Sequence, residues 1–347
     1  MGRAESNLHP ALLWEALPDG AAQCNLCAHR CVVRPGEAGI CAVRRNVDGE
    51  LFTRVYGRST NLQVDPIEKK PLFHFYPGAR ALSLATVGCN FSCEHCQNHS
   101  ISQWPRCHDP DAPVPGRPYS PEEIAGAAEE TDSRVVAYTY TEPTIYMEYA
   151  LDIARLVEEQ GRKNVFVTNG YMTAEAVELI APYLHGANVD LKGTDDRVLK
   201  REIKAEHGPV MRTIEDLHAR GVFVEVTTLI VPGSNDDDDQ LRQIAEFIAN
   251  LDAQMPWHVS RFHPTYQRVD RPSTPESTIR RAIEIGAEAG LRHVFAGNLW
   301  GAEAESTRCP GCQEVVIQRR AYTLGKISLE GGKCAACGHA ISGRGLP

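Results

Sequence analysis

The chain has 347 residues, with 36 Lys and Arg against 45 Asp and Glu, a formal charge of -9 and 42% hydrophobic residues. This composition excludes a disordered or collagen-like chain, and the negative charge disfavours general nucleic-acid binding. No apolar run approaches the ~20 residues needed to cross a bilayer, and the beginning of the chain shows no secretory signal. We therefore expect a cytoplasmic protein without membrane association. The length allows one large domain with small appendages, or two domains.

Twelve cysteines are the strongest signal in the sequence. All but Cys107 fall into three groups whose spacing is typical of metal ligands. Because the chain shows no export signal and can bury a sizeable core, metal binding is favoured over disulfide bonds.

The first group has the spacing C-x2-C-x3-C-x9-C. It consists of Cys24, Cys27, Cys31 and Cys41. Pro35-Gly36 and Gly39 permit the tight turns that would bring the last cysteine back to the others. Four thiolates suit either zinc or an iron–sulfur cluster, and we favour zinc here.

The second group follows an apolar run, Leu82 to Val87, that predicts a buried strand. It consists of Cys89, Cys93 and Cys96. Three thiolates cannot complete a four-coordinate structural zinc site alone. They can hold a [4Fe–4S] cluster, which normally takes four cysteines, so that one iron keeps an open position for a small molecule. A zinc site completed by His95 or His99 is the alternative.

Beyond the second group, strand-like apolar runs alternate with amphipathic helical stretches. This alternation predicts βαβ units around a parallel sheet, and about six units fit. We predict an α/β fold with a partial (β/α)6 TIM-type barrel over residues 76–300. A small Cys-rich N-terminal region would occupy residues 1–75, and a C-terminal zinc-ribbon or rubredoxin-like domain residues 301–347.

Polar side chains recur at the predicted carboxyl ends of these strands, where such barrels place their sites. They are Glu142 in Tyr-Thr-Glu-Pro, Asn169 in Thr-Asn-Gly, Asp190 and Lys192 in Asp-Leu-Lys, and His263 in Arg-Phe-His-Pro. Such groups can bind the ammonium and carboxylate of a zwitterion and the hydroxyls of a ribose. Each alone could be a cap or turn residue, and His263 fits a structural role equally well.

These motifs resemble those of the radical S-adenosylmethionine (SAM) enzymes, whose signature is C-x3-C-x2-C after a strand. By that resemblance the cluster ligands are Cys89, Cys93 and Cys96. The open iron would chelate SAM, and the reduced [4Fe–4S] cluster would cleave it to methionine and a 5′-deoxyadenosyl radical. His95 would lie near the adenine and Glu142 would bind the amino group of SAM. Asn169, Asp190 and Lys192 would contact ribose and methionine, and His263 would line the substrate side.

The resemblance extends to one branch of the superfamily. Gln97-Asn98 and the Thr-Asn-Gly and Asp-Leu-Lys triplets resemble the pyruvate-formate-lyase-activating-enzyme-like branch. The stretch CNLCAHRCVVRPGEAGICAVRRN, with Tyr-Thr-Glu-Pro and the barrel, resembles the AmmeMemoRadiSam-system radical SAM enzymes over roughly residues 20–300.

The resemblance implies hydrogen abstraction and a flavodoxin- or ferredoxin-type reductant. The substrate would be a backbone glycine of a partner, if the protein is a glycyl-radical-enzyme activase, or else a small molecule or another macromolecule. A non-catalytic iron–sulfur and zinc scaffold, or an electron-transfer protein, is the alternative from a different class.

The last group forms two C-x2-C knuckles on either side of a strand-like run. It consists of Cys309, Cys312, Cys334 and Cys337. Two knuckles at this separation are typical of a zinc ribbon with four thiolate ligands, and a rubredoxin-like iron is the alternative because it takes the same geometry. Cys107 lies in a proline-rich loop. We interpret it as incidental, with hydrogen-atom donation near the radical site as the alternative.

Overall fold

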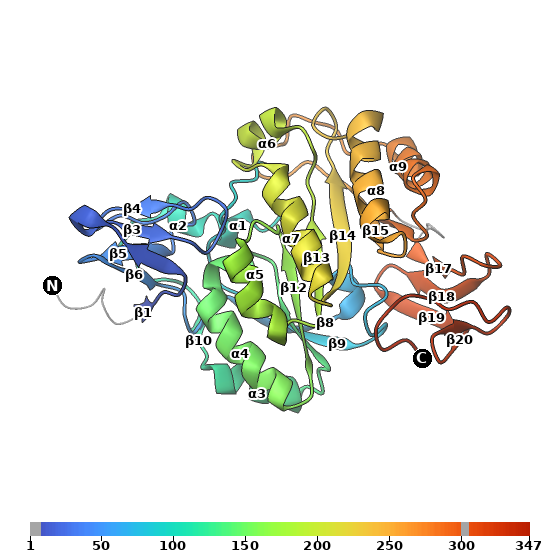
Figure 1. Cartoon of the computed structure of the whole chain (residues 1–347), viewed down its shortest axis with the longest axis horizontal. Coiled ribbons are helices and arrows are strands. Elements are labelled where there is room, and N and C mark those ends of the chain that lie inside the picture. Colours follow the sequence, from blue (N-terminus) through green and yellow to red (C-terminus); the bar gives the residue numbers. More distant parts are fainter. Residues whose placement is uncertain (1–7, 300–304) are drawn as a thin grey trace.

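The computed structural model describes residues 8–299 and 305–347 (Figure 1). Its centre is an eight-stranded sheet in the order β16-β15-β14-β13-β12-β11-β9-β8. The strands from β9 to β16 in this sheet are parallel to their neighbours, whereas β8 joins the edge antiparallel to β9. Because β8 and β16 remain edges, the sheet is a partial barrel and not a closed one.

The strands of this sheet are separated along the chain by helices. The strands are β8 (Asn61–Pro66), β9 (Arg80–Ala85), β11 (Val135–Tyr138), β12 (Lys163–Thr168), β13 (Gly186–Asp190), β14 (Phe223–Ile230), β15 (Trp257–Arg261) and β16 (Val294–Gly297). The helices are α1 (His99–Ser102), α2 (Trp104–Cys107), α3 (Pro121–Glu130), α4 (Met147–Glu159), α5 (Ala174–Ile180), α6 (Asp196–Glu202), α7 (His207–Ala219), α8 (Asp238–Asp252) and α9 (Glu276–Glu288). Six strand–helix units therefore precede β16, which confirms the predicted α/β partial barrel.

The longer helices cover the outer face of the sheet because each carries one apolar stripe (Figure 1). In α8 the buried residues are Leu241, Ile244, Ala245 and Ile248, which recur at helical spacing. The acidic run Asp236 to Asp239 forms the start of α8, because the side chain of Asp237 accepts a hydrogen bond from the Gln240 amide.

The N-terminal region is built from very short strands at the left of Figure 1. They are β1 (His9–Pro10), β2 (Trp14–Ala16), β3 (Ala22–Cys24), β4 (Val32–Val33), β5 (Arg44–Val47), β6 (Glu50–Thr53) and β7 (Arg58–Ser59), the last paired with β10 (Arg117–Pro118). The region packs on the carboxyl ends of the barrel strands. The Ala28 amide donates to the Tyr171 carbonyl after β12, and His29 Nε2 lies 2.9 Å from the Asn90 carbonyl after β9.

The C-terminal residues form a small β-structure at the right of Figure 1. Its strands are β17 (Thr307–Arg308), β18 (Val315–Arg320), β19 (Thr323–Ile327), β20 (Leu329–Glu330) and β21 (Lys333–Cys334). It docks on the segment that precedes β9. The ring nitrogens of buried His74 lie 2.9 Å from the Ser342 carbonyl and 3.0 Å from Thr307 Oγ1, and Arg319 donates to the Phe73 carbonyl.

The division at residues 75 and 300 stays a prediction. β8 lies before the first boundary but pairs along its whole length with β9. The second boundary falls outside the described residues. Within the part of the chain that the structure describes, no helix is long and apolar enough to cross a membrane.

Candidate active site

The loop after β9 carries the three cysteines of the central group. Gly88 opens it with a φ of +99°, and a Cβ there would lie 2.7 Å from Val43 Cγ1. Both the backbone angle and the close approach require glycine. Within the loop the Phe91 amide donates to Cys89 Sγ at 3.4 Å, and Cys96 Sγ lies 3.2 Å from Ser102 Oγ.

Arg106 holds this loop in place. Its guanidinium donates to the carbonyls of Cys89 at 2.7 Å and Phe91 at 2.9 Å, and to the Ile40 carbonyl of the N-terminal region at 2.7 Å. Three carbonyls from two regions are therefore fixed by one cation. The sequence analysis missed this residue, because nothing in its proline-rich surroundings marks it.

The central thiols lie in surroundings that oppose their ionisation. Burial raises the pKa of Cys89 well above its usual range, and the Glu142 carboxylate adds to this effect. Burial also raises the pKa of Cys93 to about 12, although the Lys192 ammonium opposes the shift. Metals bind the thiolate form, so a cationic metal centre bound here would supply the charge that favours deprotonation of these sulfurs.

The donor set fits a cluster better than a single ion. Among residues 8–299 and 305–347, the group of metal-ligating side chains gathered around one point is the C-terminal one, and none of the three central cysteines belongs to it. The buried Nδ1 of His95 has no hydrogen-bond partner, which is consistent with a missing group beside the loop.

Glu142 joins the ends of two neighbouring strands. Its Oε1 accepts hydrogen bonds from the Thr144 amide at 3.0 Å, Thr144 Oγ1 at 2.6 Å and Thr168 Oγ1 at 2.7 Å, and its Oε2 accepts from the Asn169 amide at 2.7 Å. Burial raises the pKa of this carboxyl group, and its hydrogen bonds oppose the shift. The side chain thus positions the Thr-Asn-Gly turn, and binding of the SAM amino group stays a prediction.

Asn169, Asp190 and Lys192 lie beside the cysteine loop. Asn169 Nδ2 is 2.7 Å from Asn90 Oδ1 and 3.8 Å from Cys89 Sγ. Lys192 Nζ is 3.0 Å from Asp190 Oδ2. Burial alone would lower the pKa of Lys192, but the Asp190 carboxylate and the nearby Cys93 outweigh it and raise the pKa. The site therefore keeps the charged Lys192 close to its thiols.

The two predicted histidines lie in different places. Burial lowers the pKa of His95 to about 3, and the charge of Lys192 adds to the shift, so the imidazole is neutral beside the loop. His263 is exposed, with its Nδ1 3.0 Å from Ser273 Oγ, and it lines a large cavity. The structure thus groups the predicted residues around the cysteine loop, except for His263. Cys107 is exposed at the end of α2.

That cavity has a volume of about 920 Å³ and lies between the sheet and the C-terminal β-structure. Its walls come from residues 68–73, the inner faces of β14 and β15, the end of β16 and residues 305 and 320–322. Charged groups of both signs line it, including Glu68, Lys69, Glu305 and Arg320. Its size falls within the range of small-molecule sites.

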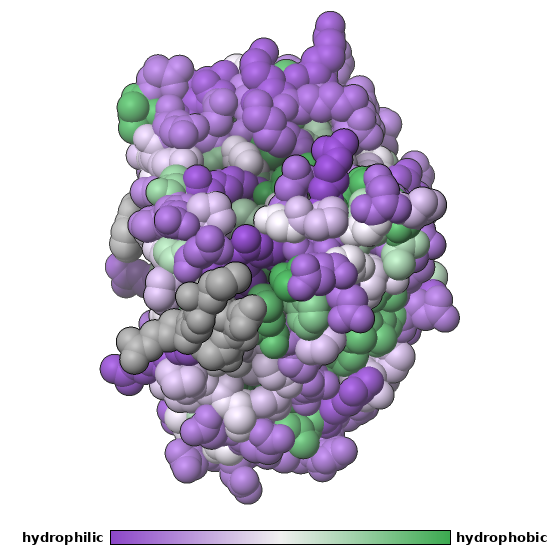
Figure 2. All heavy atoms as spheres, turned by 90° about the vertical axis from the view of Figure 1, so that its left-hand side faces the viewer, coloured by the Kyte–Doolittle hydropathy of each residue, from purple (hydrophilic) through white to green (hydrophobic). Residues whose placement is uncertain are grey.

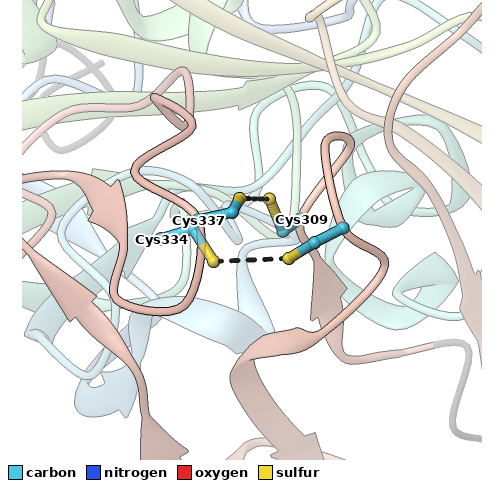
Figure 3. A group of neighbouring side chains, drawn as sticks. Cys309, Cys334 and Cys337 are labelled. Atoms are coloured by element: carbon cyan, nitrogen blue, oxygen red, sulfur yellow. Dashed lines mark hydrogen bonds between the residues drawn. The ribbon is translucent and has the colours of Figure 1, made fainter.

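The C-terminal cysteines converge tightly (Figure 3). The Sγ atoms of Cys309 and Cys337 are 3.6 Å apart, and those of Cys312 and Cys334 are 3.7 Å apart. Four sulfurs around one zinc ion at about 2.3 Å would be about 3.8 Å apart. The set therefore fits one tetrahedral metal ion.

Comparisons with known proteins agree with this geometry. A family model described as the radical SAM superfamily matches residues 83–248. The chain is 41% identical to an uncharacterized protein of Methanocaldococcus jannaschii, over 96% of this chain and 99% of the relative. It is 23% identical to a second protein of that organism, named as a candidate glycyl-radical enzyme activating enzyme, over 59% of this chain and 76% of the relative.

Among solved structures, a domain of pyruvate-formate lyase-activating enzyme from Bacteroides vulgatus superposes with a TM-score of 0.41 and 18% identity. The match covers 47% of this chain and 98% of that domain. The family match begins within β9 and spans the cysteine loop and the strand ends around it, up to α8. The chain belongs to the radical SAM superfamily.

Proposed function

We propose that the protein is an enzyme that binds a [4Fe–4S] cluster, cleaves SAM reductively and abstracts hydrogen from a substrate. The cluster ligands would be Cys89, Cys93 and Cys96. One observation carries the proposal: the loop after β9 holds three thiols beside the cation of Lys192, at the carboxyl ends of the barrel strands. Three thiolates leave one iron of the cluster open.

The chain's own residues would prepare this site. A reduced cluster, when bound, would supply one electron for the cleavage of SAM to methionine and a 5′-deoxyadenosyl radical. Lys192 offsets the negative charge of the thiolates, and Asn169 presents its amide to Cys89 Sγ. Glu142 holds the turn that carries Asn169. His95 offers a neutral, buried ring as a face for the adenine.

The substrate would bind in the cavity beside His263. The finer proposal is a glycyl-radical-enzyme activase, which is supported by the similarity to a relative named as a candidate for that activity. A small-molecule substrate is the second candidate. It is favoured by the cavity volume of about 920 Å³, because ligand pockets commonly fall between about 300 and 1,000 Å³.

A flavodoxin- or ferredoxin-type protein would supply the electron. The C-terminal set Cys309, Cys312, Cys334 and Cys337 would hold one structural zinc ion, because its sulfur spacing suits a tetrahedral ion. Iron fits the same four thiolates, and metal analysis of the purified protein separates the two.

The matched pair Cys93→Ala and Cys107→Ala tests the enzymatic proposal. Both proteins are purified without air, analysed for iron and sulfide, and incubated with SAM and dithionite. We expect Cys93→Ala to lose the central cluster and to form less than about one hundredth of the wild-type 5′-deoxyadenosine. Cys107→Ala, an exposed position, should behave as the wild type does. Undiminished product from Cys93→Ala contradicts the proposal.

The scaffold alternative predicts a different result. A non-catalytic iron–sulfur protein would keep its cluster but form no 5′-deoxyadenosine from SAM. The activase proposal has its own readout, a glycyl radical signal by electron paramagnetic resonance in a partner enzyme incubated with the reduced protein and SAM. Rapid product formation with a small molecule, and no such signal in candidate partners, would favour the second candidate.

A further inference from the structure

The segment that carries Lys192 is an irregular loop, residues 191–195, between β13 and α6. This β13 loop leads into α6 at the top of Figure 1. Figure 2 shows mostly hydrophilic side chains covering that end of the molecule. Water competes for the polar groups of a loop at such a surface, so the loop depends on bonds from neighbouring segments to keep one conformation.

Asn235 joins the β13 loop to the neighbouring strand. It follows β14, just before the start of α8, and its side chain is buried. Its Nδ2 donates to the Lys192 carbonyl at 2.8 Å and to the Leu229 carbonyl at 2.9 Å. Its Oδ1 accepts from the Val231 amide at 2.7 Å. The oxygen and both N–H bonds of this amide are therefore used, and one of them fixes the backbone of Lys192.

Other contacts hold the β13 loop on either side of Lys192. Gln240, in the first turn of α8, accepts from the amides of Thr194 and Asp195 at 3.1 Å each. Before the lysine, the Leu191 carbonyl accepts from Thr228 Oγ1 at 2.9 Å. The loop thus stays anchored when the bond from Asn235 is removed, and that bond acts mainly on Lys192.

The position of the lysine ammonium decides how strongly it acts on the central cysteines. Lys192 Nζ lies 3.0 Å from Asp190 Oδ2, and the lysine side chain is mostly buried. Its charge also reaches Cys93, where it opposes the rise in the pKa of that thiol. Charges interact more strongly in a partly buried site than in water, and the interaction falls with distance. A loosely held lysine would therefore offset less of the negative charge of the thiolates.

We infer that Asn235 is a positioning residue, which holds the Lys192 ammonium beside the three central cysteines through the lysine carbonyl and so favours the reduced form of a bound cluster. The effect on the cluster rests on the proposed function, whereas the coupling of Asn235 to Lys192 does not. A reduced cluster carries one more negative charge than the oxidised cluster, so a nearby cation raises its reduction potential. A purely structural role predicts a loss of stability with no change in that potential.

Chemical labelling of the anaerobically purified chain tests the coupling. Acetic anhydride acetylates free amines, and mass spectrometry follows the reaction at each lysine. In Asn235→Leu the rate at Lys192 should rise about fivefold or more, whereas exposed Lys326 should react at the wild-type rate. The matched control is Asn164→Leu, because Asn164 Nδ2 also donates to two carbonyls but lies near the amino end of β12. This control should leave Lys192 as protected as in the wild type.

The reduction of the cluster at a fixed solution potential tests the effect on the site. The readout is the electron paramagnetic resonance signal that Cys93→Ala lacks. In Lys192→Met the ratio of reduced to oxidised cluster should fall about tenfold, and in Asn235→Leu about threefold or more. The double variant Asn235→Leu/Lys192→Met should match Lys192→Met, because Asn235 acts through the lysine. Asn164→Leu should keep the wild-type ratio.

Three results overturn the inference: an unchanged ratio in Asn235→Leu, an equal fall in Asn164→Leu, or a double variant well below Lys192→Met. If Asn235→Leu does not fold, Asn235→Ser replaces it, with a fall in the same direction expected. A wild type that shows the signal but forms no 5′-deoxyadenosine refutes the proposed function and leaves the role of Asn235 standing. A wild type without the signal refutes both.

Discussion

The buried ion pair between Arg44 and Glu148 ties the N-terminal region to α4, and its removal gives a quantitative test of the packing. The side chains are only 1% and 2% exposed. The arginine also donates to the Leu12 carbonyl and to Cys24 Sγ, and Glu148 accepts from the Leu12 amide. In Glu148→Ala a buried guanidinium loses its carboxylate, which typically costs about 3–5 kcal/mol. We expect about 3 kcal/mol here, because two acceptors remain near the cation.

Hydrogen exchange of the metal-loaded protein measures this loss. At about 1.4 kcal/mol per tenfold change, protection of the amides in β5 and the first turns of α4 should fall more than a hundredfold. The double variant Arg44→Met/Glu148→Leu should recover most of the lost protection, because this variant buries neither charge. Glu276→Ala breaks the exposed pair with Arg280 and should change protection little. Additive effects of the Arg44 and Glu148 substitutions, or a loss below about 1 kcal/mol, would refute the reasoning.

Three further outcomes follow from the described contacts. Gly88→Ala should lower the iron content per chain, because a Cβ would lie 2.7 Å from Val43 Cγ1 at a φ of +99°. Glu142→Gln should lower the free energy of unfolding by about 1–3 kcal/mol in thermal unfolding. The substitution replaces one accepting oxygen by an NH2 group, so at least one of the four donors loses its acceptor. The third outcome concerns pH. Burial lowers the pKa of His74 well below its usual value and that of His293 to about 4. The unfolded chain then binds more protons than the folded one between pH 6.5 and 4, so stability falls as the pH drops through that window, by up to about 1.4 kcal/mol per unit for each histidine. His293→Phe should flatten this dependence in unfolding measured at pH 7.5 and 5.5, and an unchanged slope would contradict the assignment.

The barrel could be predicted from local sequence patterns, whereas the N-terminal region and the edge strand β8 could not. Alternating apolar runs and amphipathic stretches are long enough to define the strands from β9 to β16 and their helices. The strands of the N-terminal region are two to four residues long, too short for any period to appear. β8 contains Gln63, Asp65 and Pro66 and reads as a loop, yet it forms the edge of the sheet against β9.

The candidate site also has one part that the sequence predicts and another that it does not. Cysteine spacing alone predicted three groups, because ligands of one metal centre lie close in sequence. The residues that hold those groups in place lie far apart in sequence. Arg44 and Glu148 are 104 positions apart, and Arg106 contacts Ile40 across 66 positions. Such contacts are set by how the N-terminal region docks on the barrel, and a single sequence carries no signal for that docking.

The two terminal groups of four cysteines lie in different places in the fold, although each consists of four cysteines. The N-terminal set adjoins the loop after β9 through Arg106, which donates to the carbonyls of Ile40 and Cys89. The C-terminal set packs instead in the small core with Val316 and Ile317, in the β-structure whose residues 305 and 320–322 form one wall of the large cavity. A metal ion bound by these four cysteines would stabilise that wall and not the loop after β9, because the small β-structure buries few other side chains. Loss of that ion should therefore loosen the substrate side of the molecule while the cysteine loop keeps its contacts.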